Sequence, residues 1–148
     1  METRNVRIGI CAKQTDDMSP DAEPTVMNIF CEAKLTDDGK EFTVEYEEFL
    51  VDGGGSTDTK LIFKKDEPGV VSMVRTGLVK MACSFSDDER FNCVYSMADG
   101  ISLDFCMVTK GLENTLSMEG GRLLVKYNIE VRGLVVSKNE YRLTVLKK

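Results

Sequence analysis

The stretch from residue 70 to residue 107 most constrains the fold, because it consists of short alternating runs separated by turn residues. It reads VVSMVRTGLVKMACSF, then SDDE, RFNCVYSM, ADG and ISLDFCM. Alternation of apolar and polar residues with a period of two is typical of strands that bury one face. The stretch therefore predicts consecutive antiparallel hairpins, and nothing in it indicates a particular chemistry.

The position of Gly77 leaves two registers open for the first of these runs. In one register, Gly77 begins a two-residue type II′ turn, since glycine tolerates positive φ. This hairpin puts Ser72 and Thr76 on a mostly apolar face and places Arg75 opposite Lys80, pointing outward or lying at a rim.

In the competing register, Gly77 is only a kink in one long strand. Arg75 then lies on an apolar face, where an inward charge needs a partner. We favour the hairpin, because a single strand of this length would exceed the usual range. The face that Arg75 would share in the competing register consists of Val71, Met73, Val79, Met81, Cys83 and Phe85.

Three further turns follow from glycine positions. A three-residue loop at 98–100 predicts that Tyr95 lies opposite Leu103, with Asp104 on the solvated face. An Asp38-Gly39 type I′ turn predicts the pairs Leu35–Phe42, Ala33–Val44 and Cys31–Tyr46, and sets Glu32 opposite Glu45. A turn at Gly120-Gly121 predicts that Asn114 lies on a core face opposite Tyr127. Residues 137–140 are predicted to turn the chain into a last strand at 141–146.

Composition places the chain among ordinary soluble proteins. Its 148 residues, of which 42% are hydrophobic, suit one domain spanning residues 1–148, with flexible loops at about 14–24 and 51–59. The net charge of −6 disfavours nucleic acid as a partner. No apolar run is long enough to span a membrane, and METRNVRIG has no signal core, so we expect a cytoplasmic protein.

The absence of histidine excludes several chemistries at once. It removes Ser-His and Cys-His nucleophile activation and the commonest metal ligand. The five cysteines are Cys11, Cys31, Cys83, Cys93 and Cys106, too dispersed for a zinc motif, and we expect them to be reduced structural thiols. We therefore expect neither a metal nor a cofactor, and no catalytic residues.

Several segments taken together resemble the YwiB-like bacterial proteins, a family of unknown function. The resemblance spans roughly residues 5–146 and rests on the order of VRTG at 74–77, YSM at 95–97, Thr109-Lys110 and KYNI at 126–129. It implies a calycin-type, lipocalin-like β-barrel and no established activity. Together with short hairpins, it predicts an all-β protein with a single antiparallel up-and-down barrel of about 8–10 strands.

Two functions compete for such a barrel. The first is non-catalytic binding of a small apolar or amphipathic molecule in the interior. The alternative is an interaction or regulatory protein with a side-chain-filled barrel, which acts through its outer surface or as a homodimer. It relies on four aliphatic residues that are predicted on outer faces and could form an interface, namely Val71, Met73, Val94 and Leu124. An enzyme would need a carboxylate pair, Arg75, a tyrosine or a thiolate, and no motif brings these together. The residues predicted to contact an interior ligand are Arg75, Tyr46, Tyr95, Asn114, Tyr127, Ser72 and Thr76.

Overall fold

The computed structural model describes residues 1–148 except 18–20, 22, 50–54, 98–99 and 147–148. The described chain forms ten β-strands. No helix among these residues is long and apolar enough to cross a membrane. The strands are β1 (Glu2–Asp16), β2 (Thr25–Asp37), β3 (Glu41–Phe49), β4 (Ser56–Lys64), β5 (Val70–Gly77), β6 (Val79–Ser86), β7 (Arg90–Met97), β8 (Ser102–Asn114), β9 (Arg122–Val131) and β10 (Leu134–Leu146).

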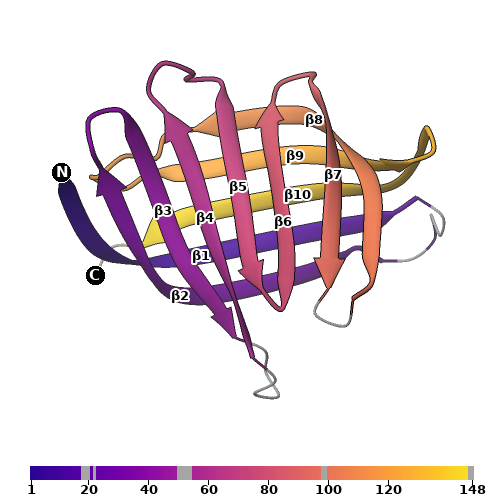
Figure 1. Ribbon diagram of the computed structural model, residues 1–148, viewed down its shortest axis with the longest axis horizontal. Coiled ribbons are helices and arrows are strands. Elements are labelled where there is room, and N and C mark those ends of the chain that lie inside the picture. Colours follow the sequence, from indigo (N-terminus) through magenta and orange to yellow (C-terminus); the bar gives the residue numbers. More distant parts are fainter. Residues whose placement is uncertain (18–20, 22, 50–54, 98–99, 147–148) are drawn as a thin grey trace.

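The strands form one closed antiparallel barrel, as the sequence predicts. Each strand pairs with its neighbours in sequence, and β1 pairs with β10 to close the sheet. Figure 1 shows a flattened barrel in which β3–β7 cross in front of the long strands β8–β10, β1 and β2. Closure pairs every edge strand, which removes the exposed edges that an open sheet of this size would carry.

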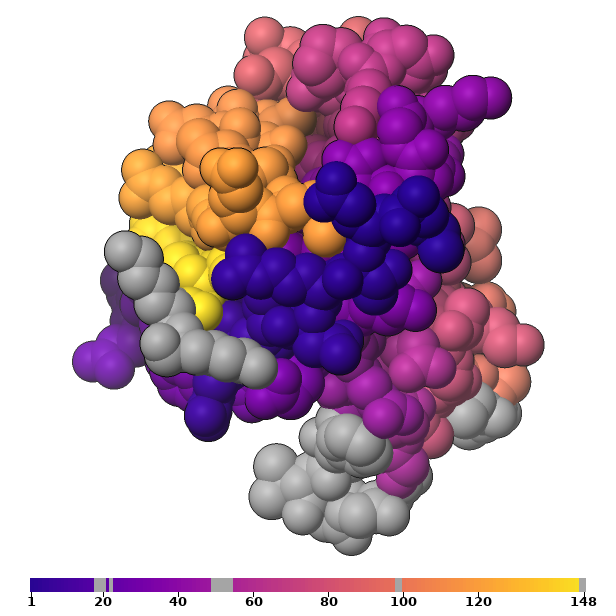
Figure 2. All heavy atoms as spheres, turned by 90° about the vertical axis from the view of Figure 1, so that its left-hand side faces the viewer, coloured from indigo at the N-terminus to yellow at the C-terminus, as the bar shows by residue number. Residues whose placement is uncertain are grey.

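Side chains fill the end of the barrel at which the chain begins, which we call the closed end. Leu35, Leu61, Leu123 and Leu143 point inward and are fully buried there. Arg4 of β1 donates a hydrogen bond of 2.8 Å to the Met118 carbonyl beyond β8. Figure 2 looks onto this end, where the N-terminal strand meets the β8–β9 segment. The C-terminal ends of β1, β3, β5, β7 and β9 lie at the opposite end of the barrel, which we call the mouth (Figure 1).

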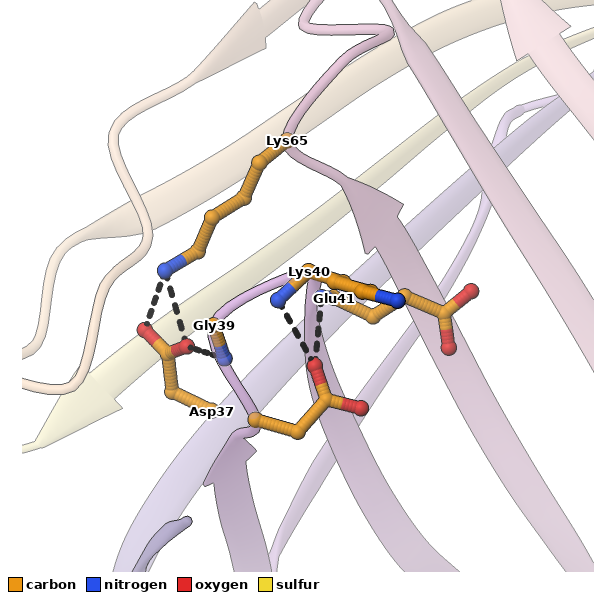
Figure 3. Close-up of polar contacts among 6 residues, drawn as sticks. Asp37, Gly39, Lys40, Glu41 and Lys65 are labelled. Atoms are coloured by element: carbon orange, nitrogen blue, oxygen red, sulfur yellow. Dashed lines mark hydrogen bonds and ion pairs between the residues drawn. The ribbon is translucent and has the colours of Figure 1, made fainter.

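The β2–β3 turn is one residue later than predicted. Asp38 N–H bonds to the Glu41 carbonyl, so Gly39 and Lys40 form its centre. The Asp38 carboxylate fixes this turn by accepting hydrogen bonds from the backbone N–H groups of Lys40 and Glu41, at 2.8 and 2.7 Å (Figure 3). These two bonds also hold the pKa of Asp38 below its usual range.

The later turn moves the β2–β3 pairs but preserves their faces. Leu35 lies opposite Val44 and Ala33 opposite Tyr46, rather than Phe42 and Val44 as predicted. The shift is two positions along the partner strand, so the predicted inward residues stay inward. It also replaces the predicted clash of Glu32 with Glu45 by a Lys34–Glu45 pair. Beside the turn, Lys65 contacts the Asp37 carboxylate at 2.8 Å (Figure 3).

The β5–β6 hairpin exists, but its predicted register is wrong by one residue. Arg75 lies opposite Met81, and Ser72 lies opposite Ser84. Gly77 has the expected positive φ of 127°, yet Leu78 alone separates the two strands. A Cβ at Gly77 would lie 2.5 Å from the Ser56 carbonyl oxygen of β4, so glycine allows this close approach.

A shift of one residue moves the β5 side chains to the opposite face. Met81, Cys83 and Phe85 of β6 stay on the inner face, as predicted. Val71 and Met73, predicted outside, are 1% and 7% exposed in the core. Arg75 points inward with them, as in the competing register, while Ser72 and Thr76 share the outer face. The predicted inward orientation of Ser72 and Thr76 is therefore wrong.

The β8–β9 register also differs from the prediction. Asn114 lies opposite Leu123, and an irregularity between Thr109 and Gly111 brings Thr109 opposite Tyr127. The Asn114 side chain is exposed at the closed end and accepts a 2.9 Å hydrogen bond from the Leu116 N–H. The loop at 115–121 is longer than a two-residue turn, so the predicted pairing of Asn114 with Tyr127 is wrong. Asn114 shares the face of the buried Leu123, but it lies at the end of the strand, outside the core.

Two predicted loops are partly strand. Residues 14–16 extend β1, and residues 56–59 begin β4; the rest of the predicted loops includes 18–20, 22 and 51–54, outside the described residues. The predicted turn at 137–140 lies within β10, and the chain turns at Arg132-Gly133 instead. The β7–β8 register is confirmed, with Tyr95 opposite Leu103 and Asp104 opposite Val94.

Candidate ligand site in the barrel interior

A continuous row of inward side chains crosses five neighbouring strands near the mouth. Ala33 of β2 pairs with Tyr46 of β3, which pairs with Thr59 of β4. Thr59 pairs with Arg75 of β5, which pairs with Met81 of β6. Directly opposed residues share a face of the sheet, so this row places a phenol, a hydroxyl and a guanidinium side by side in the interior.

Apolar side chains line the mouth beyond this row. Met27 and Leu103 are each 50% exposed, and Met97 and Val131 are each 39% exposed. The register puts all four on the inner face, because their strands bury residues of the same parity, such as Cys93 on β7. The closed end is thus filled, whereas the mouth presents inward apolar surface to solvent.

Two opposite walls of the barrel meet at a pair of tyrosines. The hydroxyls of Tyr46 on β3 and Tyr141 on β10 lie 2.7 Å apart. Burial raises the pKa of both phenols far above the usual value. Burial likewise raises the pKa of Tyr127 to about 12, where its ring packs 5.1 Å from that of Phe85. All three phenols are therefore neutral hydrogen-bonding groups at physiological pH.

The Arg75 guanidinium forms an ion pair inside the barrel. Its Nη2 lies 3.3 Å from Oε2 of Glu48, and the two side chains are 24% and 22% exposed. The Glu48 charge also contributes to raising the pKa of the Cys31 thiol, after burial, so these groups lie close together. We call Tyr46, Glu48, Thr59, Arg75 and Tyr141 the interior polar cluster.

Two atoms of the interior polar cluster lack hydrogen-bond partners. Among the described residues, Thr59 Oγ1 and Arg75 Nε are buried side-chain atoms without any partner. Thr59 is 1% exposed, and the hydroxyl of its neighbour Tyr46 is directed to Tyr141. Buried polar atoms are usually paired, so two adjacent unpaired ones need an explanation.

The structure brings four of the seven predicted ligand-contacting residues to the interior. Tyr46, Tyr95, Tyr127 and Arg75 face inward, although the register that we favoured placed Arg75 outside or at a rim. The other three do not: Ser72 and Ser84 hydrogen-bond at 3.1 Å on the outer face, and Thr76 and Asn114 are exposed.

Sequence reasoning missed Glu48, Thr59 and Tyr141. Thr59 lies in the loop predicted at 51–59, and Glu48 lies in the acidic run EYEEF, for which the sequence predicts no site. Tyr141 begins the last predicted strand, 141–146, but no pattern within one strand indicates its contact with Tyr46 across the barrel.

All five cysteines are free in this structure. The contact between Cys83 and Cys93 lowers the pKa of the Cys93 thiol. A hydrogen bond to Cys93, together with burial, raises the pKa of the Cys83 thiol, and burial raises that of Cys31. No group of three or more potential ligands that could hold a metal occurs within the described part of the chain.

A groove of about 870 Å³ runs over the outer face of β2–β5. Half of the residues that line it are charged, including a Lys60–Glu45 ion pair of 3.6 Å, and Thr76 is also part of the lining. Its charged side chains include an ion pair on the outer face, whereas the mouth combines inward apolar side chains with buried polar atoms that lack partners, so the mouth and the interior polar cluster are the stronger candidate site.

Comparisons with known proteins identify a family and a fold but no activity. The family model described as a domain of unknown function, DUF1934, matches residues 8–143. The chain is similar to the ywiB protein from Bacillus subtilis, whose crystal structure superposes with a TM-score of 0.77 at 19% identity, covering 98% of this chain and 94% of that one. No curated protein matches. The resemblance inferred from the sequence is thus confirmed.

Proposed function

Because this chain belongs to the DUF1934 family, whose function is unknown, we propose a function from its geometry: non-catalytic binding of a small amphipathic molecule in the barrel mouth. The observation that carries the proposal is the division of the interior into a filled closed end and a mouth of half-exposed, inward apolar residues. Apolar walls with a few polar groups at their base are typical of small-molecule sites.

The polar groups suit binding rather than catalysis. The Tyr46 and Tyr141 phenols and the Cys31 and Cys83 thiols have raised pKa values, which favours their neutral forms over nucleophilic ones. Arg75 and Glu48 can bind a charged group of a ligand. The interior polar cluster contains no second carboxylate that could form a general acid–base pair with Glu48.

The alternative, an interaction protein that acts through its outer surface or as a homodimer, has less support. It relied on four aliphatic residues on the outer faces, and two of these, Val71 and Met73, are buried in the core. Val94 is 54% exposed, and isolated exposed aliphatic residues are normal on soluble proteins.

The test compares a charge introduced inside the mouth with one introduced outside it. Leu103 faces inward and Val94 outward, and their exposed fractions are nearly equal, at 50% and 54%. Binding of Nile red, a neutral apolar dye, is measured by fluorescence for Leu103→Asp and Val94→Asp.

We expect Leu103→Asp to weaken binding about tenfold or more, because a carboxylate in the mouth opposes burial of an apolar ligand. Val94→Asp should leave binding unchanged. Equal affinities of both variants, or no binding of the dye to the unmodified chain, would contradict an apolar site in the mouth.

A further inference from the structure

We propose that the mouth selects amphipathic molecules that carry a carboxylate, and that Arg75 and Thr59 bind this carboxylate at its base. The proposal rests on the proposed binding function and adds the chemical class of the ligand. It explains the two adjacent buried atoms without partners, Arg75 Nε and Thr59 Oγ1.

The Arg75 guanidinium has unused hydrogen-bonding capacity. It carries five N–H donors in a planar fork that matches a carboxylate. Its partner, Glu48, contacts one Nη at 3.3 Å, longer than the roughly 2.7–2.9 Å of a strong charge-assisted bond. By comparison, Arg90 contacts Glu130 at 2.7 Å on the outer face. Glu48 therefore occupies Arg75 weakly and leaves the Nε–H without a partner.

Thr59 supplies a second donor at the required place. It lies directly opposite Arg75 on the neighbouring strand, and both side chains face the interior. Cβ atoms of directly opposed residues are about 4.5–5.5 Å apart, a separation at which one carboxylate can contact both side chains. A carboxylate oxygen can then accept hydrogen bonds from Thr59 Oγ1 and Arg75 Nε, the two atoms that lack partners.

The charge of the row favours a monoanion. Arg75 is the only cation in the row that runs from Ala33 to Met81, and Glu48 already contributes one negative charge beside it. A dianionic phosphate in this partly buried place would meet stronger repulsion from Glu48. The apolar part of the ligand would extend along Met27, Met97 and Leu103 toward solvent.

The experiment measures displacement of Nile red by dodecanoate and by dodecanol, which share a chain and differ in charge. We expect the unmodified chain to prefer dodecanoate about tenfold or more, and Arg75→Gln to lose this preference by weakening dodecanoate binding about 10- to 100-fold. Arg142→Gln is the matched control, because Arg142 contacts Glu140 at a similar 3.4 Å on the outer face; it should keep the preference.

Glu48→Gln should change dodecanoate binding in the direction opposite to Arg75→Gln. Removing the competing carboxylate should strengthen dodecanoate binding about threefold or more and leave dodecanol unchanged. This variant keeps Arg75 and decides the question even where Arg75→Gln does not fold. Unchanged or weaker dodecanoate binding by Glu48→Gln overturns the proposal, as does a preference that survives Arg75→Gln in folded protein.

The two levels of proposal fail in different ways. Equal displacement by dodecanoate and dodecanol would overturn carboxylate selection and leave the apolar mouth intact as a binding site. No binding of Nile red, dodecanoate or dodecanol would overturn the proposed function itself.

Discussion

The contact between Tyr46 and Tyr141 makes a quantitative prediction about how opposite walls of the barrel are joined. Their hydroxyls lie 2.7 Å apart, and β3 and β10 are not neighbours in the sheet. Replacing either tyrosine with phenylalanine removes one hydrogen bond and leaves the other buried hydroxyl unpaired. Such a change costs about 1–3 kcal/mol, whereas replacing both partners by apolar groups is much closer to neutral. We therefore expect the double variant to be destabilised by less than the sum of the single variants, by about 1 kcal/mol or more.

Thr59 makes the two single variants unequal. Its unpaired Oγ1 neighbours Tyr46, so the Tyr46 hydroxyl has a substitute partner when Tyr141 is replaced. The Tyr141 hydroxyl has no such neighbour in the register of the described strands. Tyr141→Phe should consequently destabilise the barrel less than Tyr46→Phe.

Urea unfolding measures these differences in stability. It is followed by far-ultraviolet circular dichroism, because the chain has no tryptophan whose fluorescence could report unfolding. Tyr95→Phe is the control, because its hydroxyl makes no hydrogen bond to any described residue, and it should change stability by no more than about 0.5 kcal/mol. Additivity of Tyr46→Phe and Tyr141→Phe within about 0.3–0.5 kcal/mol would refute a direct contact between the two walls.

Three further variants or conditions test the register and the interior. Gly77→Ala should destabilise the chain by about 1–3 kcal/mol, and by more than Gly39→Ala. Both glycines have positive φ, but only a Cβ at Gly77 would clash, at 2.5 Å from a backbone oxygen. Equal urea midpoints of the two variants would contradict the described turn. Arg75→Ala should cost about 2–3 kcal/mol in the same assay, since it strands the partly buried Glu48, whereas an outward Arg75 would cost no more than about 0.5 kcal/mol. Burial raises the pKa of Tyr127 to about 12 from an unfolded value of about 10. The stability that the neutral phenol contributes is therefore fully present below pH 10 and is lost as the pH rises toward 12. Tyr127→Phe should reduce the loss of stability between pH 10 and pH 12, and an unchanged loss would contradict the burial of Tyr127.

Alternation predicted the faces of the strands wherever the partner residue moved by an even number of positions or not at all. In β2–β3 the partner of Leu35 moved from Phe42 to Val44, two positions along, and both partners are inward residues. In β7–β8 the pairs of Tyr95 and Cys93 are as predicted. Hydrophobic periodicity is thus sufficient for the barrel and for most of its core, because it depends only on parity.

Registers that depend on long-range contacts could not be predicted in this way. The irregularity between Thr109 and Gly111 changes the partner of Tyr127, and nothing in the local sequence distinguishes Lys110 as an extra residue. At β5–β6 the deciding contact is with β4, where Leu78 N–H bonds to the Ser56 carbonyl. A glycine that permits a type II′ turn equally permits this tighter one, so the sequence around Gly77 is compatible with both parities.

The parity of that turn determines whether the barrel has an interior charge. With two residues at the tip, Ser72 and Thr76 would face inward and Arg75 would be a solvated cation. With Leu78 alone at the tip, Arg75 faces inward beside Thr59 and Glu48. The inward arrangement buries a cation that the apolar pattern alone would place outside, which costs stability unless the charge is used. A failure of the alternating apolar pattern at one inward polar group is expected where a protein binds a ligand. Arg75 is therefore the residue to test first, independently of any similarity to known proteins.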